Sequence, residues 1–183
     1  MSEKKIRWNS EKVLSVSAMA ISFITLIIFI YQTNLMSRQN YLSIMPYLAT
    51  STSNNPKLHA YSISLQNHGI GPAIIESVTF RYKNREYDLK DFENEVHTFL
   101  KTQDARFDSL QTVSYGTLDK GLAIPANTNY LILGVEGYER DYKMLMTELN
   151  RLLDDGLEYE IVYKSIQDEH WVIHNDSEGP EKL

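Results

Sequence analysis

Residues Val13–Tyr31 read VLSVSAMAISFITLIIFIY, an apolar run of 19 residues. The run lies inside a longer stretch, 13–37, that contains no charged residue. At about 1.5 Å per residue, a helix of this length spans roughly 28 Å, which is close to the hydrocarbon thickness of a bilayer. A buried helix in a small soluble domain would not need to be apolar on every side. The run therefore predicts a transmembrane helix over residues 13–33.

A cleavable signal peptide is the main alternative for this segment. A basic start fits both interpretations, and the basic residues before the run are Lys4, Lys5, Arg7 and Lys12. The run is longer than the ~7–15 apolar residues usual in signal peptides, and no Ala-x-Ala-like cleavage site follows it. We therefore expect an uncleaved, single-pass anchor in the plasma (inner) membrane, with the lipid bilayer as a partner.

The flanking basic residues predict the orientation of this anchor. Four of them lie in the basic tail 1–12, and only Arg38 follows the run closely. Basic residues next to a membrane span are enriched on the cytoplasmic side. We therefore expect a cytoplasmic N-terminus and an extracytoplasmic C-terminal domain.

Small residues recur along one face of the predicted membrane helix. Ser15, Ala18, Ser22 and Thr25 are spaced three, four and three residues apart. Small residues allow helix backbones to approach closely, and Ser and Thr can hydrogen-bond across the contact. The spacing predicts a helix-association face and a homo-oligomer, although small residues are also common in membrane helices that do not associate.

Charge is distributed unevenly along the chain. The whole chain has 18 Lys and Arg against 24 Asp and Glu, a formal net charge of −6. Residues 1–41 carry five basic and two acidic side chains, so the rest of the chain carries 13 and 22. Such an acidic domain argues against a nucleic-acid polymer as partner, because nucleic-acid binders present a basic surface. The absence of cysteine excludes disulfides, a cysteine nucleophile and thiolate metal sites.

Hydropathy patterns predict a folded domain over residues 46–175. Residues 34–45 continue the membrane helix as a juxtamembrane helix or linker that ends before Pro46, because the residue before a proline avoids helical backbone angles. Alternation of apolar and polar residues predicts strands at 58–66, 73–82, 86–89, 112–118, 128–135, 157–164 and 170–174.

Two segments of this domain have helical rather than alternating periodicity. Apolar residues at helical spacing predict amphipathic helices at 90–102 and 138–155, the second ended by Gly156. The fold class expected is mainly β (α+β), an antiparallel β-sandwich with two inserted helices. The last residues, 176–183, are polar and are expected to form a disordered tail.

The segment Leu65–Ile74 reads LQNHGIGPAI and predicts a tight turn between two strands. Gly69 and Gly71 can adopt positive φ angles, Pro72 fixes the entry to the next strand, and Asn67 can hydrogen-bond to neighbouring backbone. The same cluster could instead form a nest of backbone N–H groups that binds an anion. A single Gly-x-Gly favours the structural turn.

Three short motifs occur in order along the chain: Met45-Pro46-Tyr47, Asn67-His-Gly-Ile-Gly-Pro-Ala73, and Ile161-Val-Tyr163-Lys-Ser-Ile166 with Trp171. In these motifs the chain resembles a loose group of uncharacterised bacterial single-pass membrane proteins. The resemblance implies an immunoglobulin-like β-sandwich next to the membrane, and it implies no catalytic residue. The segments 90–102 and 138–155 are larger insertions than the pattern of that group requires.

No sequence motif for catalysis or cofactor binding was found among the common ones, such as Gly-x-Ser-x-Gly, the Walker loop, the dinucleotide fingerprint and HExxH. His170 and His174 could share a metal on a helix, but on a strand they lie roughly 13 Å apart. Acidic residues at 91–95 and at Asp154-Asp155 suit solvated helix ends better than a hydrolytic carboxylate pair. We expect no catalytic residue, no metal and no cofactor.

These patterns favour a membrane-anchored, non-enzymatic binding or scaffold protein whose protein or small-molecule ligand is unknown. An alternative is an oligomeric membrane effector or sensor, in which the domain binds a small ligand such as a nucleotide signal. A nucleotide signal would require a cytoplasmic domain, against the orientation expected from the basic residues. A membrane-tethered hydrolase is a third possibility that no residue pattern supports.

Overall fold

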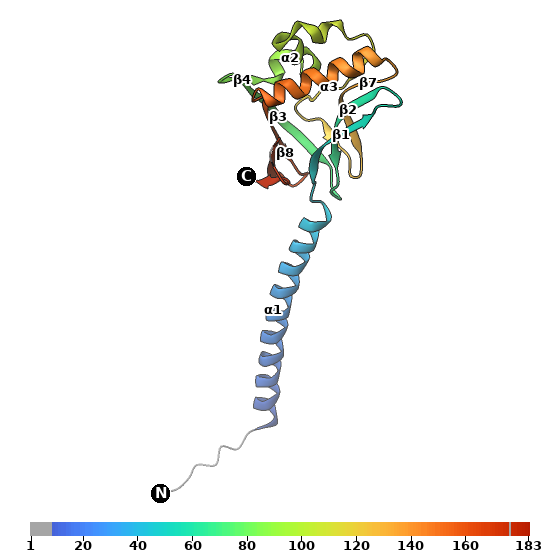
Figure 1. The fold of residues 1–183 in the computed structure, drawn as a ribbon. Helices are drawn as coiled ribbons and strands as arrows, with labels where there is room; N and C mark the ends of the chain where they lie inside the picture. The colour runs from blue at the N-terminus through green and yellow to red at the C-terminus, as the bar shows by residue number, and fades with distance from the viewer. Residues whose placement is uncertain (1–8, 176) are drawn as a thin grey trace. The chain divides into compact units, whose positions relative to one another are not determined.

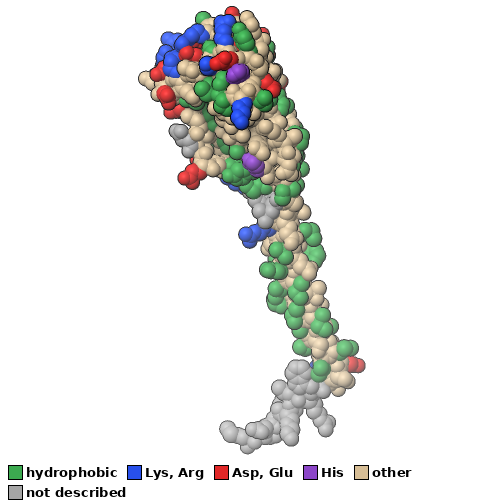
Figure 2. Space-filling view, turned by 45° about the vertical axis from the view of Figure 1, so that its right-hand side comes forward, with side chains coloured by type: hydrophobic (Ala, Val, Ile, Leu, Met, Phe, Trp, Pro, Cys, Tyr) green, Lys and Arg blue, Asp and Glu red, His purple; other side chains and the backbone are tan. Residues whose placement is uncertain are grey.

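The computed structural model describes residues 9–175 and 177–183, and the chain divides into two units, residues 1–43 and 44–183. The first unit is built on one helix, α1 (Ser10–Ser43), of 34 residues. Its segment Ser10–Asn40 is long and apolar enough to cross a membrane, and it is not buried in the protein. Hydrophobic side chains project from α1 along its length (Figure 2). A signal sequence near the N-terminus would meet the same criteria of length and composition.

The predicted membrane helix 13–33 and the predicted juxtamembrane helix 34–45 are therefore one continuous helix. It ends at Ser43, two residues earlier than expected. The residues that follow, from Ile44 onward, belong to the second unit, and Met45 and Tyr47 form backbone hydrogen bonds with the turn that follows β2. These hydrogen bonds hold Met45 and Tyr47 against that turn, and the helix ends before Pro46.

The second unit contains two antiparallel sheets (Figure 1). Sheet A has the strand order β1-β2-β7-β5, and sheet B has the order β10-β9-β8-β3-β4, with β6 also paired to β3. The strands of sheet A are β1 (Leu48–Asn55), β2 (Ala60–Asn67), β5 (Val113–Tyr115) and β7 (Asn129–Val135). The strands of sheet B are β3 (Ala73–Tyr82), β4 (Arg85–Asp88), β6 (Ala123–Ile124), β8 (Glu158–Lys164), β9 (His170–His174) and β10 (Glu181–Lys182).

Helices close one end of the two sheets. Helix α3 (Glu139–Asp154) lies across that end and packs against β2 and β7 (Figure 1). Its buried face includes Leu145, Leu149 and Leu152, which follow helical spacing. Gly156 has a φ of 89° just after the helix, as expected for a left-handed C-terminal cap.

The helix expected at 90–102 is interrupted. A short 3₁₀ helix, η1 (Leu89–Phe92), comes first, and α2 (Val96–Gln103) begins four residues after it ends. Glu93 and Asn94 have φ values of 58° and 57°, and left-handed residues cannot continue a right-handed helix. A second 3₁₀ helix, η2 (Ala105–Ser109), follows α2 and packs on it.

Two other segments differ from their sequence-based expectation. The strand expected at 112–118 is shortened to β5, because Thr117 leaves β7 and forms a bridge with Glu95. The expected disordered tail at 176–183 contains β10, which pairs with β9. Residue 176 lies outside the described residues. The tail is polar, but Leu183 N–H also donates to the carbonyl of His170, so backbone pairing orders it.

The two sheets meet through buried aromatic side chains. The backbone N–H of Leu48 in β1 donates to the hydroxyl of Tyr163 in β8, at 3.2 Å. Burial raises the pKa of Tyr163 to about 12, so this hydroxyl stays protonated at neutral pH. Tyr163 stacks on Trp171 in β9, and Phe80 in β3 stacks on Phe99 in α2 with ring centroids 4.4 Å apart. The core thus extends from the space between the sheets to the face of α2 that carries Phe99.

A group of paired charges fastens η2 to α3. Glu148 in α3 is buried, and its carboxylate accepts from Arg106 and, at 2.7 Å, from Nε of Arg151. Asp104, just before η2, accepts from the same two arginines at 2.6 and 2.7 Å. The hydrogen bonds from Arg106 hold the pKa of Asp104 well below its usual range. Asp104 therefore stays charged at neutral pH, and its ion pairs with both arginines hold η2 to α3.

Candidate functional site

An apolar cavity, here called the inner cavity, lies between the two sheets and below the helices. Its volume is about 260 Å³. Sixteen residues line it, and eleven of them have aliphatic or phenyl side chains. Protein interiors are packed to crystal-like density and leave few voids larger than a water molecule. A void of this size is therefore the strongest candidate for a ligand site in the folded unit.

Both sheets contribute walls to the inner cavity. Side chains alternate across a strand, so residues at every second position face the same way. Val78 and Phe80 from β3 and Ile161 from β8 line it on the side of sheet B. Ile63 from β2 and Ile132 from β7 line it on the side of sheet A.

The helices form the remaining wall. Val96 and Leu100 of α2, and Leu149 and Leu153 of α3, line the inner cavity at i and i+4 spacing. Residues four apart lie on the same face of a helix. Three of these side chains are buried, whereas Leu153 is 39% exposed. The end of α3 therefore lies at the opening of the cavity rather than over its closed part.

Polar residues mark the same opening. Thr50, Thr52 and Asn175 line the inner cavity and are exposed. The hydroxyls of Thr50 and Tyr159 are 2.8 Å apart and hydrogen-bond to each other. The free edge of β1, the end of α3 and the start of β8 thus surround a mouth with uncharged polar groups and an apolar interior. This arrangement can take an apolar group inside and hydrogen-bond a polar group at the mouth.

His97 lies on α2 between Val96 and Leu100, the residues of this helix that line the inner cavity. It is buried, its Nε2 is 3.3 Å from the carbonyl oxygen of Phe107, and its ring stacks on Tyr115. Its Nδ1 has no hydrogen-bond partner among the described residues. Because a carbonyl only accepts, Nε2 is the donor. Burial lowers the pKa of His97, so the imidazole is neutral at neutral pH.

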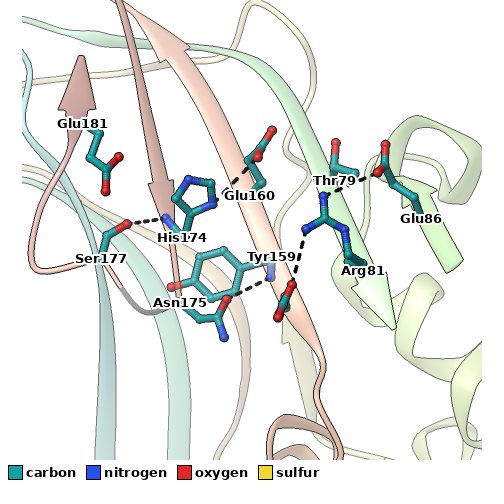
Figure 3. Close-up of a pocket in the computed structure, with 10 residues that line it drawn as sticks. Thr79, Arg81, Glu86, Tyr159, Glu160, His174, Asn175, Ser177 and Glu181 are labelled. Atoms are coloured by element: carbon teal, nitrogen blue, oxygen red, sulfur yellow. Dashed lines mark hydrogen bonds and ion pairs between the residues drawn. The ribbon is translucent and has the colours of Figure 1, made fainter. Parts of the chain in front are cut away.

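A second depression, here called the outer groove, lies on the solvent face of sheet B and is shown in Figure 3. Its volume is about 320 Å³. Arg81 in β3 lies between Glu86 and Glu158, with nitrogen–oxygen distances of 3.6 and 3.5 Å. His174 is 3.8 Å from Glu160. These side chains are 38–65% exposed, and such ion pairs contribute little to stability.

The outer groove is acidic. Four glutamates line it, against one arginine and one histidine: Glu86, Glu158, Glu160 and Glu181. Within the part of the chain that the structure describes, no three His, Asp or Glu side chains are placed to hold a metal ion. Tyr159 and Asn175 line both the outer groove and the inner cavity. The mouth of the apolar cavity thus adjoins a surface that repels anions.

The turn motif is built around the side chain of Asn67, which is fully buried. Its Oδ1 accepts from the backbone N–H groups of Tyr47 and Gly69, at 3.1 and 2.9 Å. Its Nδ2 donates to the carbonyls of Gly71 and Ile124, at 2.9 and 3.0 Å. All four hydrogen-bonding positions of the amide are therefore used. The side chain joins the turn to two segments that are distant in sequence.

The two glycines of the motif do not have the positive φ angles expected from the sequence. They allow the chain to pass closely instead. A Cβ on Gly69 would lie 2.6 Å from Cα of Pro46, and a Cβ on Gly71 would lie 2.5 Å from the carbonyl carbon of Ile44. The physical reason for these glycines is space, because the segment at 44–47 lies directly on the turn.

The alternative of an anion-binding nest is not supported by the turn. Its backbone N–H groups already donate to protein acceptors: His68 to Tyr47 O, Gly69 to Asn67 Oδ1, and both Ile70 and Gly71 to Met45 O. Pro72 has no N–H group to offer, and β3 begins at the next residue. Asn67, Gly69, Gly71 and Pro72 therefore form a structural connection between the first residues of the domain and its sheets.

The predicted helix-association face lies on α1. The hydroxyls of Ser15, Ser22 and Thr25 donate to the carbonyls four residues earlier, at 2.9, 2.9 and 2.8 Å. Ala18 supplies one of those carbonyls. These side chains are satisfied within the helix, so they do not need a second helix for their hydrogen bonds. Self-association through this face stays a prediction.

The histidines and acids considered from the sequence lie apart from the inner cavity. His170 and His174 point to the solvent face of sheet B and contact different carboxylates, His170 that of Glu76 at 2.6 Å. Asp154 and Asp155 are exposed at the end of α3, where Asp155 accepts from Arg151. The structure does not bring these groups into one site.

In comparisons with known proteins, no family model, no curated protein and no solved structure matches this chain. The geometry of the inner cavity and its mouth is therefore the basis for inferring a function.

Proposed function

We propose that the chain is a membrane-anchored, non-enzymatic binding protein whose folded unit takes an apolar ligand into the inner cavity. The observation that carries this proposal is the cavity itself, with a volume of about 260 Å³ and no charged residue among those that line it. A dry, apolar cavity can bind a small organic molecule, because ligand contacts replace contacts that the walls otherwise lack. The uncharged polar groups at the mouth would orient the ligand.

We propose further that α1 anchors the domain in the inner membrane with the N-terminus in the cytoplasm. The length and composition of Ser10–Asn40 and the basic residues before it support this arrangement. Because the chain has no cysteine, Lys57→Cys in the exposed turn after β1 creates a single labelling site. We expect a membrane-impermeant maleimide to label this variant in intact spheroplasts, with the cysteine-free chain as control. Labelling only after lysis would place the domain in the cytoplasm.

The domain itself is proposed to be an immunoglobulin-like sandwich, as the sequence resemblance implies. In that fold the strands of one sheet follow the order A-B-E-D and those of the other G-F-C. Sheet A has the order β1-β2-β7-β5 and sheet B contains β9-β8-β3. These orders correspond when strands are lettered along the chain, with β4 and β6 set aside as extra strands that pair with β3. On this assignment α2 and α3 are insertions that close one end of the sandwich.

Photolabelling tests whether the inner cavity binds an apolar molecule. The full chain in lipid nanodiscs is irradiated with a ten-carbon alcohol that carries a diazirine, and crosslinked peptides are identified by mass spectrometry. We expect crosslinks in the peptides that contain Val96–Leu100 and Leu157–Ile161, because both segments line the cavity. Crosslinks confined to α1 would mean that the probe only reaches the helix through lipid, and the proposal would be wrong.

A matched pair of variants in β1 tells cavity binding from surface adsorption. Thr52 lines the mouth, whereas Ser53 is the next residue of the strand, points to the opposite face of sheet A and is exposed. Thr52→Trp places an indole in the mouth, and we expect crosslinks within the domain to fall at least tenfold. Ser53→Trp should leave them unchanged. Equal labelling of both variants would contradict entry through this mouth.

A further inference from the structure

The volume of the inner cavity limits the size of its ligand. A cavity of about 150 Å³ accommodates benzene, with its six carbon atoms. The inner cavity is about 260 Å³, which by proportion holds roughly ten carbon atoms. This is smaller than the clefts that take drug-sized ligands, which begin at ~300 Å³. A dinucleotide or a two-chain lipid is therefore too large to enter as a whole.

The mouth of the cavity determines which end of a ligand stays outside. The hydroxyls of Thr50 and Tyr159 meet there, and Thr52 and Asn175 add uncharged polar groups. Apart from Tyr61 the deeper walls are aliphatic or phenyl, formed by residues such as Val78 and Ile132. A molecule with one apolar end and one polar end matches this division, because burying an unpaired polar group deep in the cavity would be unfavourable.

The charges around the mouth exclude an anionic head group. None of the residues that line the inner cavity is Lys or Arg, so a carboxylate or phosphate at the mouth would find no cation there. The adjoining outer groove presents Glu158, Glu160 and Glu181 near the two residues that both sites share, Tyr159 and Asn175. Negative charge at the mouth would therefore be repelled as well as unpaired.

From these three observations we infer that the ligand is an amphiphile with a single alkyl chain of about ten carbons and a head group without negative charge. Its chain occupies the inner cavity, and its head group hydrogen-bonds at the mouth beside Thr50 and Tyr159. The inference rests on the proposed function, since a membrane-anchored domain lies where such molecules concentrate. It goes further by naming the chemical class of the ligand.

Competition against the photolabel tests chain length. The full chain in nanodiscs is labelled in the presence of hexanol, octanol, decanol or tetradecanol, each at the same free aqueous concentration set by dialysis. We expect the apparent affinity of the competitor to rise about fourfold for each added methylene up to roughly ten carbons, and then to rise no further. A rise that continues unchanged to tetradecanol would mean an open groove and would overturn the inference.

Head-group charge is tested at constant chain length. Decanoate at neutral pH should compete at least tenfold more weakly than decanol. Ser53→Trp, which points away from the mouth, should preserve the difference. If decanoate competes as well as decanol while labelling of the domain persists, the inference is wrong and the proposed function stands. If the domain is not labelled at all, the proposed function fails first.

Discussion

Replacing Asn67 by alanine is expected to lower the free energy of unfolding by about 4 kcal/mol. The substitution removes four hydrogen bonds from a fully buried site. It leaves the N–H groups of Tyr47 and Gly69 and the carbonyls of Gly71 and Ile124 without that partner. Each buried polar group left unpaired costs ~1–3 kcal/mol. The measurement is urea-induced unfolding of the full chain in detergent micelles, followed by tryptophan fluorescence, since Trp171 is buried.

Two further variants make this result specific. Asn67→Asp keeps the oxygen that accepts from Tyr47 and Gly69, but it replaces the Nδ2 donor to Gly71 and Ile124 by a second acceptor oxygen, so it should also destabilise the fold. Asn150→Ala replaces an exposed asparagine on α3 and should change the free energy of unfolding by less than about 0.5 kcal/mol. A loss below about 1 kcal/mol for Asn67→Ala would show that water or backbone movement replaces the four hydrogen bonds.

Gly71→Ala is expected to destabilise the folded unit by about 3 kcal/mol. The new Cβ would overlap the carbonyl group of Ile44, its carbon at 2.5 Å, and both atoms of that group are backbone. A side chain could rotate away from such an overlap, but here the segment at 44–47 would have to move. That movement would also break the hydrogen bonds that Met45 O accepts from Ile70 and Gly71. The same unfolding measurement reports the loss.

Gly137→Ala is the matched control for this steric argument. Gly137 has a φ of 83° and no atom within 4 Å of where a Cβ would lie. Alanine there bears only the conformational cost of positive φ, about 1 kcal/mol. Gly71→Ala should therefore be clearly the more destabilising of the two. Equal effects would mean that the close passage at Gly71 relaxes without cost.

Alternating hydropathy predicted most of the longer strands, but it did not predict β1. The bounds of β3 and β9 coincide with the predicted segments 73–82 and 170–174. Hydropathy periodicity did not predict the structure where the backbone angles of single residues interrupt a helix. Glu93 and Asn94 adopt left-handed angles that a pattern of apolar residues does not register. It also failed for β10, because two polar residues owe their strand conformation to pairing with β9, a contact that local sequence does not encode.

For the Asn67 turn and the inner cavity, too, the sequence predicted local contacts but not contacts between distant segments. The sequence predicted that the side chain of Asn67 would hydrogen-bond to neighbouring backbone. It does so with Gly69 and Gly71. Its bonds to Tyr47 and Ile124 join segments 20 and 57 residues away, which no local rule gives. The inner cavity was not predictable. Val78, Leu100 and Ile161 looked like ordinary core residues, and the space between them exists only because of how far apart the sheets and helices pack.

The bond between Leu48 and Tyr163 has a consequence for biosynthesis. The two residues are 115 positions apart, so the first strand of the domain emerges long before its partner on β8 is made. At ~5–20 residues per second the ribosome needs on the order of ten seconds to cover that interval. During this time α1 has already left the exit tunnel, while β1 still lacks its contact with sheet B. Completion of the domain must therefore follow translation of β8, long after α1 has been synthesised.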